Sequence, residues 1–227
     1  MSFIVGIDGP AGTGKGTVTA LIAKKYHLLN IDTGAMYRCV ALRMLKDNIG
    51  VDDEEKIAEM LKNINIEMSE ENGKQKVYLD GEDVSEEIRG KEVSGFVSPA
   101  SSVIQIRLAM AGLQRKMAIG KNVIMEGRDI CTYVLPSADV KIYLDATAEV
   151  RAMRRFKQNQ EKGIDMSYEE VLESIEKRDK NDREKEIGAL KIADDATVID
   201  TTNLNIKQVE AAVSKVIDET LSKKKKN

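Results

Sequence analysis

A glycine-rich segment near the start of the chain has the composition of a phosphate-binding loop. It follows the apolar run Phe3–Ile7 directly and leads into a helical pattern that begins at Lys15. Glycines let backbone N–H groups converge on one point, and the N-terminus of the following helix adds partial positive charge. Lys15 supplies a mobile cation for the β- and γ-phosphates of a nucleoside triphosphate. The predicted ATP contacts are Gly9, Pro10, Ala11, Gly12, Thr13, Gly14, Lys15, Gly16 and Thr17.

The hydroxyl of this loop is displaced by one position from the general motif. That motif has Ser or Thr directly after the lysine, whereas here Gly16 intervenes before Thr17. We therefore expect Thr17 to lie near Mg²⁺, directly or through water, and Asp8 to hold either Mg²⁺ waters or the loop itself. The chain lacks the Asn-Lys-x-Asp guanine motif of switch GTPases, and none of its apolar strands ends in the Asp-Glu pair of work-performing ATPases. The Gly-Lys-Gly-Thr variant favours a nucleoside monophosphate kinase.

A second anion site is predicted where the next strand meets the next helix. Thr33 and Gly34 offer a hydroxyl and backbone N–H groups at this junction. Arg38 follows about one helical turn later on the same side, within reach of the same anion. The alternative for Arg38 is a salt bridge on an amphipathic helix.

Two further sets of basic residues are candidates for phosphate contacts. Arg128 follows the predicted strand Asn122–Met125, at the carboxyl end of a parallel strand, where open α/β sheets bind ligands; its alternative is an ion pair with Asp129. Arg151 and Arg155 are spaced i, i+4 on one predicted helix, where like charges repel unless an anion lies nearby. The alternative for that pair is a solvated basic face balanced by neighbouring glutamates.

Five motifs in this order resemble bacterial cytidylate kinases, over about Phe3 to Leu221. They are Ile7-Asp8-Gly9-Pro10, the Gly-Lys-Gly-Thr loop, Asp32-Thr33-Gly34-Ala35-Met36-Tyr37-Arg38, Gly127-Arg128-Asp129 and Arg178-Asp179. The resemblance implies transfer of the γ-phosphoryl group from ATP·Mg²⁺ to CMP or dCMP.

The resemblance also implies a role for each matching residue. Ser98, Arg107 and Asp129 correspond to the base-contacting set, although Ser98 before Pro99 is also a candidate helix cap. The expected catalytic residues are Lys15, Arg128, Arg151, Arg155 and Arg178. The expected monophosphate contacts are Asp32, Thr33, Gly34, Tyr37, Arg38, Ser98, Arg107, Arg128, Asp129, Arg178 and Asp182.

Two positions depart from the family pattern. Lys185 stands three residues after Asp182, where the family usually has arginine, and lysine lacks the bidentate guanidinium fork. Cys131 stands where glycine is usual; it either crowds the site or is a small buried thiol. Three other functions stay open: the same reaction on UMP or AMP, a kinase for a small sugar or alcohol, and an ATP-binding sensor without turnover.

The elements expected to position these residues define an α/β fold. Short β-branched runs alternate with helical patterns, which predicts a P-loop parallel sheet flanked by helices. We expect one domain over 1–227, with an antiparallel β insertion at about 62–92 for the monophosphate and a small helical lid at about 155–167. A helix is predicted from about Pro99 to Ile119.

Composition excludes several classes of protein. Lys and Arg number 35 against 38 Asp and Glu, so the chain lacks the basic excess of a nucleic-acid-binding protein. Two separated cysteines and one histidine argue against disulfide frameworks, thiol-redox motifs and Ser–His catalysis. No apolar run reaches about 18 residues, so no membrane span is predicted. We expect a cytoplasmic monomer.

Overall fold

The computed structural model describes residues 2–71 and 74–224. The chain divides into two compact units, Met1–Asn30 with Met117–Asn227 as one and Ile31–Lys116 as the other, called here the sheet unit and the insert unit. The sequence predicts a turn of the insertion at Asn72-Gly73 and ends in a run of lysines, 223–226; this turn and the end of this run lie outside the described residues. The expectation of one domain over the whole chain stays a prediction.

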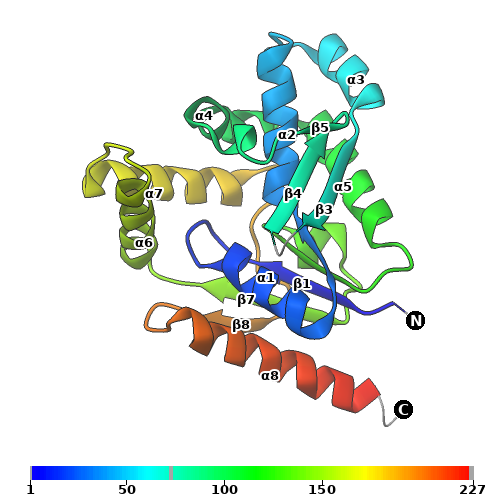
Figure 1. The fold of residues 1–227 in the computed structure, drawn as a ribbon, viewed down its shortest axis with the longest axis vertical. Helices are drawn as coiled ribbons and strands as arrows, with labels where there is room; N and C mark the ends of the chain where they lie inside the picture. The colour runs from blue at the N-terminus through cyan, green and yellow to red at the C-terminus, as the bar shows by residue number, and fades with distance from the viewer. Residues whose placement is uncertain (1, 72–73, 225–227) are drawn as a thin grey trace. The chain divides into compact units, whose positions relative to one another are not determined.

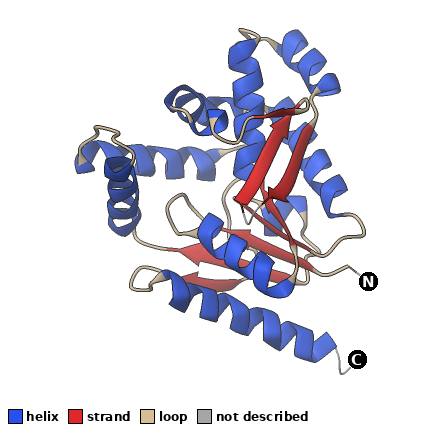
Figure 2. Ribbon diagram, viewed as in Figure 1, coloured by secondary structure: helices blue, strands red, loops and turns tan. Residues whose placement is uncertain are grey.

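The parallel sheet predicted from the short apolar runs is confirmed. Among the described residues its strands are ordered β2-β6-β1-β7-β8, and β1 is parallel to both β6 and β7 (Figure 2). Central strands buried on both faces need continuous apolar sequence, which explains why β1 and β7 consist largely of Val, Ile and Leu. The strands are β1 (Ile4–Asp8), β2 (Leu29–Asp32), β6 (Val123–Gly127), β7 (Val140–Asp145) and β8 (Thr197–Asp200).

Helices of the sheet unit pack on this sheet through apolar stripes. Val18 and Ile22 of α1 and Val213 and Ile217 of α8 have no exposed surface, and they join β1 and β7 in one core cluster. Figure 1 shows α8 running beside β7 and β8, which it contacts. The helices of this unit are α1 (Lys15–Tyr26), the short π-helix η2 (Ile130–Val134), α6 (Ala148–Glu161), α7 (Tyr168–Glu184) and α8 (Ile206–Lys224).

The insert unit contains the predicted antiparallel meander. Strands β3, β4 and β5 form a sheet in that order, and Asp80-Gly81, both with positive φ, make the turn into β5. Helix α3 was not predicted, because only Ile57 and Met60 of its residues are buried. The elements are α2 (Thr33–Lys46), α3 (Glu54–Asn63), β3 (Ile66–Glu71), β4 (Lys74–Leu79), β5 (Glu82–Asp83), η1 (Glu87–Arg89), α4 (Lys91–Ala100) and α5 (Ile104–Ala118).

The prediction of one helix from Pro99 to Ile119 is wrong. Helices α4 and α5 occupy this region, with a bend of 99° between them. Pro99 lies inside α4 and gives up a backbone donor, and the hydroxyls of Ser101 and Ser102 both donate to the carbonyl of Ser98. Serine side chains that bond the backbone in this way compete with helix continuation. Ser98 is therefore inside α4 and is not an N-cap.

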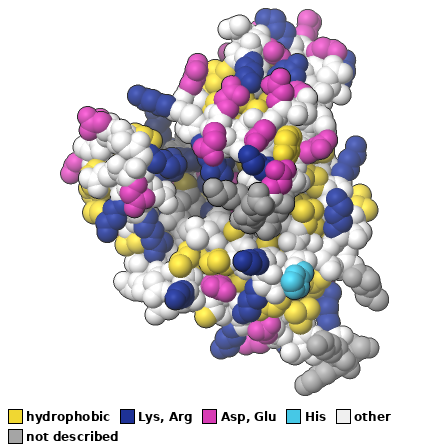
Figure 3. All heavy atoms as spheres, viewed as in Figure 1, with side chains coloured by type: hydrophobic (Ala, Val, Ile, Leu, Met, Phe, Trp, Pro, Cys, Tyr) yellow, Lys and Arg dark blue, Asp and Glu magenta, His cyan; other side chains and the backbone are white. Residues whose placement is uncertain are grey.

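Surface composition agrees with the near balance of charges in the sequence. Acidic and basic side chains are interspersed over the visible face of the molecule (Figure 3).

Within residues 2–71 and 74–224, no single helix is long and apolar enough to cross a membrane; the bent pair α4 and α5 meets the length and composition test only when the two helices are taken together.

Truncating a side chain of the α8 stripe tests the packing of this helix on the sheet. Ile217→Ala is expected to lower the free energy of unfolding by about 2–5 kcal/mol, because it leaves a cavity in a fully buried cluster. Ile119, which is 72% exposed, provides a matched control, and Ile119→Ala is expected to change stability by less than about 0.5 kcal/mol. Urea unfolding followed by circular dichroism measures both. Similar losses in the two variants would contradict this account of the core.

Candidate active site

The glycine-rich loop connects β1 to α1 and is shaped by three glycines with positive φ. Gly9 has φ +147°, and a Cβ there would lie 2.1 Å from the carbonyl oxygen of Leu144 in β7. Only glycine can bring the loop this close to the neighbouring strand. Gly12 and Gly14, with φ +85° and +91°, continue the turn into the first residue of α1.

Lys15 lies within this loop. Its Nζ donates to the carbonyl oxygens of Gly9 and Pro10, each at 2.7 Å, and the residue is only 6% exposed. Burial, with the positive charge of Arg128 second, lowers the pKa of Lys15 to about 7. The loop thus holds an amine whose charge is disfavoured until an anion approaches.

Asp8 ties the end of β1 to the segment that follows β6. Its Oδ1 accepts from the backbone N–H of Ile130 at 2.8 Å and its Oδ2 from that of Cys131 at 2.7 Å. Burial raises the pKa of Asp8 to about 6, against the opposing effect of these two bonds. These bonds hold the segment after β6, a role that differs from the two expected for Asp8, which were to hold Mg²⁺ waters or the phosphate loop. Cys131 is a buried thiol whose sulfur packs on Gly6, and burial raises its pKa.

Arg128 forms an ion pair with Asp182 of α7. Arg128 Nε lies 2.9 Å from Asp182 Oδ2, and Lys185 Nζ lies 2.8 Å from Asp182 Oδ1. Burial raises the pKa of Asp182, but Arg128, Lys185 and then Arg178 outweigh it and lower that pKa. One carboxylate therefore organises two cations, including the lysine that replaces the family's arginine.

The arginines of α6 and α7 differ in their surroundings. Arg151 is buried and bonds Asp179, so the alternative of a solvated basic face is wrong for it. Arg155 is exposed on the same helix, and Arg178 is half-buried and lowers the pKa of Lys15. The predicted lid, 155–167, comprises the last turns of α6 and its connection to α7.

Glu126 is a site residue that the sequence analysis missed. It is the fourth residue of β6, it is 8% exposed, and its Oε1 accepts from the hydroxyl of Thr19 at 3.2 Å. A Cβ on Gly16 would lie 3.2 Å from the same oxygen, so the carboxylate closes over the first turn of α1, next to the exposed Thr17. The sequence signal that could have identified Glu126 is a single acidic residue near the end of an apolar strand.

In the insert unit, residues 32–38 make up the N-cap and the first turns of α2. Asp32 caps the helix by accepting from the N–H of Ala35 at 2.9 Å. Arg38 returns over this first turn, with its NH1 3.9 Å from Asp32 Oδ2 and its side chain 30% exposed. Thr33 is buried beside them. The salt-bridge alternative for Arg38 thus describes one of its contacts.

Two of the base-contacting candidates also belong to the insert unit. The guanidinium carbon of Arg107 lies 5.4 Å from the centre of the Tyr37 ring, and its NH1 donates to the carbonyl of Ser101 at 3.2 Å. Arg107 is 3% exposed, and Ser98 is half-buried on α4. Asp129, the third candidate, belongs to the sheet unit and is buried.

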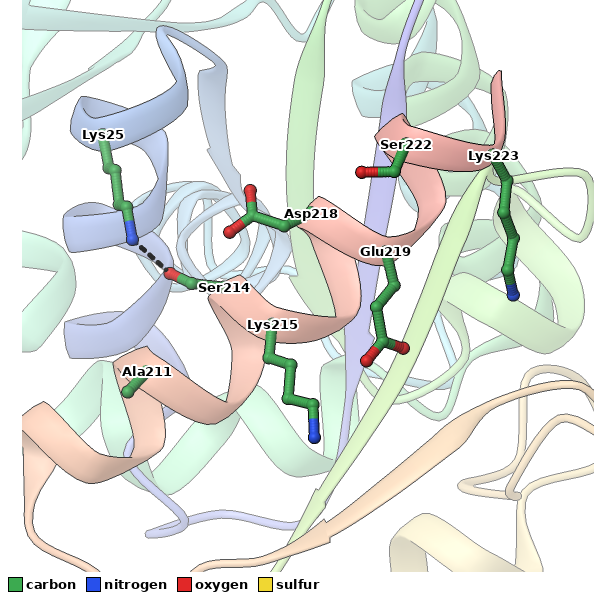
Figure 4. A pocket seen from close by; sticks show the side chains of 8 residues that line it. All are labelled: Lys25, Ala211, Ser214, Lys215, Asp218, Glu219, Ser222 and Lys223. Carbon is green, nitrogen blue, oxygen red and sulfur yellow. Dashed lines mark hydrogen bonds between the residues drawn. The ribbon is translucent and has the colours of Figure 1, made fainter. Parts of the chain in front are cut away.

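A groove of about 660 Å³ lies elsewhere in the sheet unit, between the end of α1 and α8 (Figure 4). Lys25, Lys215, Asp218 and Glu219 line it, and Lys25 donates to Ser214 at 2.9 Å. With Lys223 the lining holds three lysines and two carboxylates, and Lys25 is eleven positions into the helix that starts after the phosphate loop. This groove is not part of the site.

Comparison with known proteins bears on the whole chain. The family model for cytidylate kinase matches residues 5–219. The chain belongs to the cytidylate kinase family. It is 48% identical to a cytidylate kinase of Caldicellulosiruptor bescii over 90% of this chain and 91% of that protein. It is 44% identical to a cytidylate kinase of Bacillus subtilis over 95% of this chain and 96% of that protein.

The fold has a counterpart among solved structures. An uncharacterized protein from Eubacterium ventriosum superposes with a TM-score of 0.53 at 12% identity, over 96% of this chain and 99% of that one. Family membership makes the chain a nucleoside monophosphate kinase, and it confirms the resemblance drawn from the five motifs.

Two glycine substitutions in the loop separate steric contact from backbone strain. Gly9→Ala is expected to lower the free energy of unfolding by more than about 3 kcal/mol, because the new Cβ meets the backbone of β7. Gly14→Ala is the matched control: its nearest neighbour would be Ile206 Cδ1 at 3.7 Å, so only the positive φ costs energy, about 1–2 kcal/mol. Urea unfolding of both variants measures the difference, and equal losses would contradict the importance of the Leu144 contact.

The pKa of Lys15 predicts proton uptake when a nucleotide binds. Because the pKa of Lys15 is lowered to about 7, its amine is mostly neutral at pH 8. The negative charge of bound phosphates favours the protonated amine, so binding restores its charge. Binding of a non-hydrolysable ATP analogue at pH 8 should therefore take up roughly 0.9 proton. Calorimetry in buffers of different ionisation enthalpy measures this uptake. Lys15→Arg is the matched control, since guanidinium stays charged; uptake equal to that control would contradict the assignment.

Proposed function

We propose that the protein transfers the γ-phosphoryl group of ATP to the phosphate of CMP or dCMP, as a cytoplasmic monomer. The observation that carries the proposal is the match to cytidylate kinases over residues 5–219. The geometry of the sheet unit supports it, because a P-loop lysine and two arginines, Arg128 and Arg178, act on one another electrostatically at the same edge of the sheet.

Catalysis in this proposal is positioning and charge neutralisation. The acceptor phosphate, with a second pKa near 6, is largely dianionic at pH 7 and needs no general base. Phosphoryl transfer spreads negative charge over the transferring oxygens, where preorganised cations stabilise it. Lys15, Arg128 and Arg178 supply that charge in the sheet unit. Arg155, exposed on α6, adds positive charge when the lid closes over the nucleotides and excludes water. Arg151 adds its charge from the side of the loop where it bonds the carbonyl of Ala11.

The residues around the first turn of α1 fit a magnesium ion. Thr17 offers an exposed hydroxyl and Glu126 a carboxylate beside Gly16, and such hard oxygen donors suit Mg²⁺. No three His, Cys, Asp or Glu side chains cluster as metal ligands in the described part of the chain, so the triphosphate would complete the coordination. When bound, Mg²⁺ neutralises charge on the β- and γ-phosphates.

The acceptor contacts are proposed from both units. The start of α2 presents a hydroxyl, N–H groups and an arginine to the monophosphate, from Thr33, Gly34 and Arg38, with Asp32 capping the helix. The remaining proposed contacts are Tyr37, Ser98, Arg107, Arg128, Asp129, Arg178 and Asp182. Cytosine offers an amino donor that suits a carboxylate and two acceptors that suit arginine. Asp129 would lose its partner with uracil, which lacks the amino group.

A coupled assay of ATP conversion to ADP with five monophosphates tests the function. CMP and dCMP are expected to be turned over, while kcat/KM for UMP falls at least about a hundredfold because a buried polar group is left unpaired. AMP and GMP complete the panel. Asp129→Ala should lower CMP turnover and leave ATP affinity unchanged. ATP binding without turnover of any monophosphate would contradict the kinase, and equal rates with CMP and UMP would contradict the role of Asp129.

A further inference from the structure

A buried ion pair joins the two helices that follow β7. Arg151 NH2 on α6 lies 2.6 Å from Asp179 Oδ2 on α7, and the two side chains are 4% and 5% exposed. Moving two charges out of water is expensive, and the pair repays this cost only when its geometry is good and its other polar atoms are bonded. The expected role of Arg151 as a phosphate contact does not require such a partner.

The other bonds of Arg151 lead to the phosphate loop. Its Nε donates to the carbonyl of Ala146 at 2.9 Å, and its NH1 donates to the carbonyl of Ala11 at 3.2 Å. Ala11 is the third residue of the loop. The guanidinium therefore spans from Asp179 on α7, past the start of α6, to the loop itself.

The loop also packs directly on Arg151. A Cβ on Gly12 would lie 3.0 Å from the Cβ of Arg151 and 3.2 Å from its carbonyl oxygen. Glycine at position 12 thus lets the loop lie close to Arg151, and any side chain there would require one of them to move. Because the loop binds phosphate through backbone N–H groups, its shape determines its affinity.

A second arginine of α6, Arg154, lies near the same loop, and the bonds described for it are to uncharged oxygens. Arg154 donates to the carbonyl of Thr201 at 2.6 Å and to its hydroxyl at 3.2 Å. That hydroxyl lies 2.9 Å from the carbonyl oxygen of Asp145 and 3.3 Å from that of Thr13, and its single proton is shared between them. Helix α6 thus reaches the loop at two points. The connection through Arg151 is the one that includes α7.

We propose that Asp179 is a positioning residue for the phosphate loop. By holding the guanidinium of Arg151 against the carbonyl of Ala11, it keeps residues 11 and 12 in the conformation that binds the triphosphate. This inference rests on the proposed ATP site. It gives Asp179, which follows the phosphate-contacting Arg178 in the sequence, a function that involves no contact with substrate.

Nucleotide binding and steady-state kinetics of Asp179→Asn test the proposal. Its dissociation constant for a fluorescent ATP analogue is expected to rise about tenfold, because the loop loses its support, while the KM for CMP at saturating ATP stays within about twofold. Asp195→Asn is the matched control: Asp195 pairs with Lys141 at 2.7 Å but is 67% exposed, and this variant should bind the analogue like the wild type.

A double variant separates positioning from a merely structural role. R151M/D179L removes both charges, so it should recover the thermal stability that an unpaired buried arginine costs in Asp179→Asn. It should not recover ATP affinity, because the bond to Ala11 is gone. Recovery of affinity together with stability would overturn the proposal, as would equal rises in both substrate constants in Asp179→Asn. If Asp179→Asn does not fold, the double variant alone decides. A wild-type protein that fails to bind the analogue would overturn the ATP site and the inference with it.

Discussion

The buried carboxylate of Asp8 is the interaction on which the nucleotide edge of the sheet depends. It ends β1, and its two oxygens accept the N–H groups of Ile130 and Cys131 just beyond β6. The segment carrying Arg128 and Asp129 is thereby fixed to the strand that carries the phosphate loop. A pKa raised from 3.8 to about 6 means that this burial costs about 3 kcal/mol above pH 6, a cost relieved as the pH falls from 6 toward 3.8.

Burial of charge recurs through the rest of the site, each time with a specific partner. Asp182 lies between Arg128 and Lys185, and Asp179 bonds Arg151. A low-dielectric setting makes such pairs strong, and it also makes an unpartnered charge costly. The near-neutral composition of the chain says nothing about this arrangement, because what matters is where each charge lies relative to the ends of β1, β6 and β7.

Local patterns predicted the elements well where periodicity and end signals agreed. Helical periodicity predicts Lys15–Tyr26 and Ala148–Glu161, and α1 and α6 have these bounds. The antiparallel meander lies within the predicted insertion at about 62–92. The errors have physical causes. The region from Pro99 contains two helices, because serine hydroxyls compete for the backbone at the bend. Helix α3 was missed, since it is short and only Ile57 and Met60 of its residues are buried. Glu126 was overlooked because its contacts are with Gly16 and Thr19 of α1, which are distant from it in the sequence.

By itself the sequence determined the phosphate loop, the parallel sheet with its antiparallel insertion and the family, because glycine spacing, apolar periodicity and short motifs are local properties. Only the tertiary structure decided which charges pair. Arg128 was expected to contact phosphate, with its neighbour Asp129 as the alternative partner, and the structure bonds it to Asp182, 54 residues away. Arg151 was expected to face an anion in the site, and its guanidinium supports the loop through Ala11. Such pairings depend on which strand ends and helix faces meet after folding, where desolvation selects the partner that leaves the fewest buried charges unmatched.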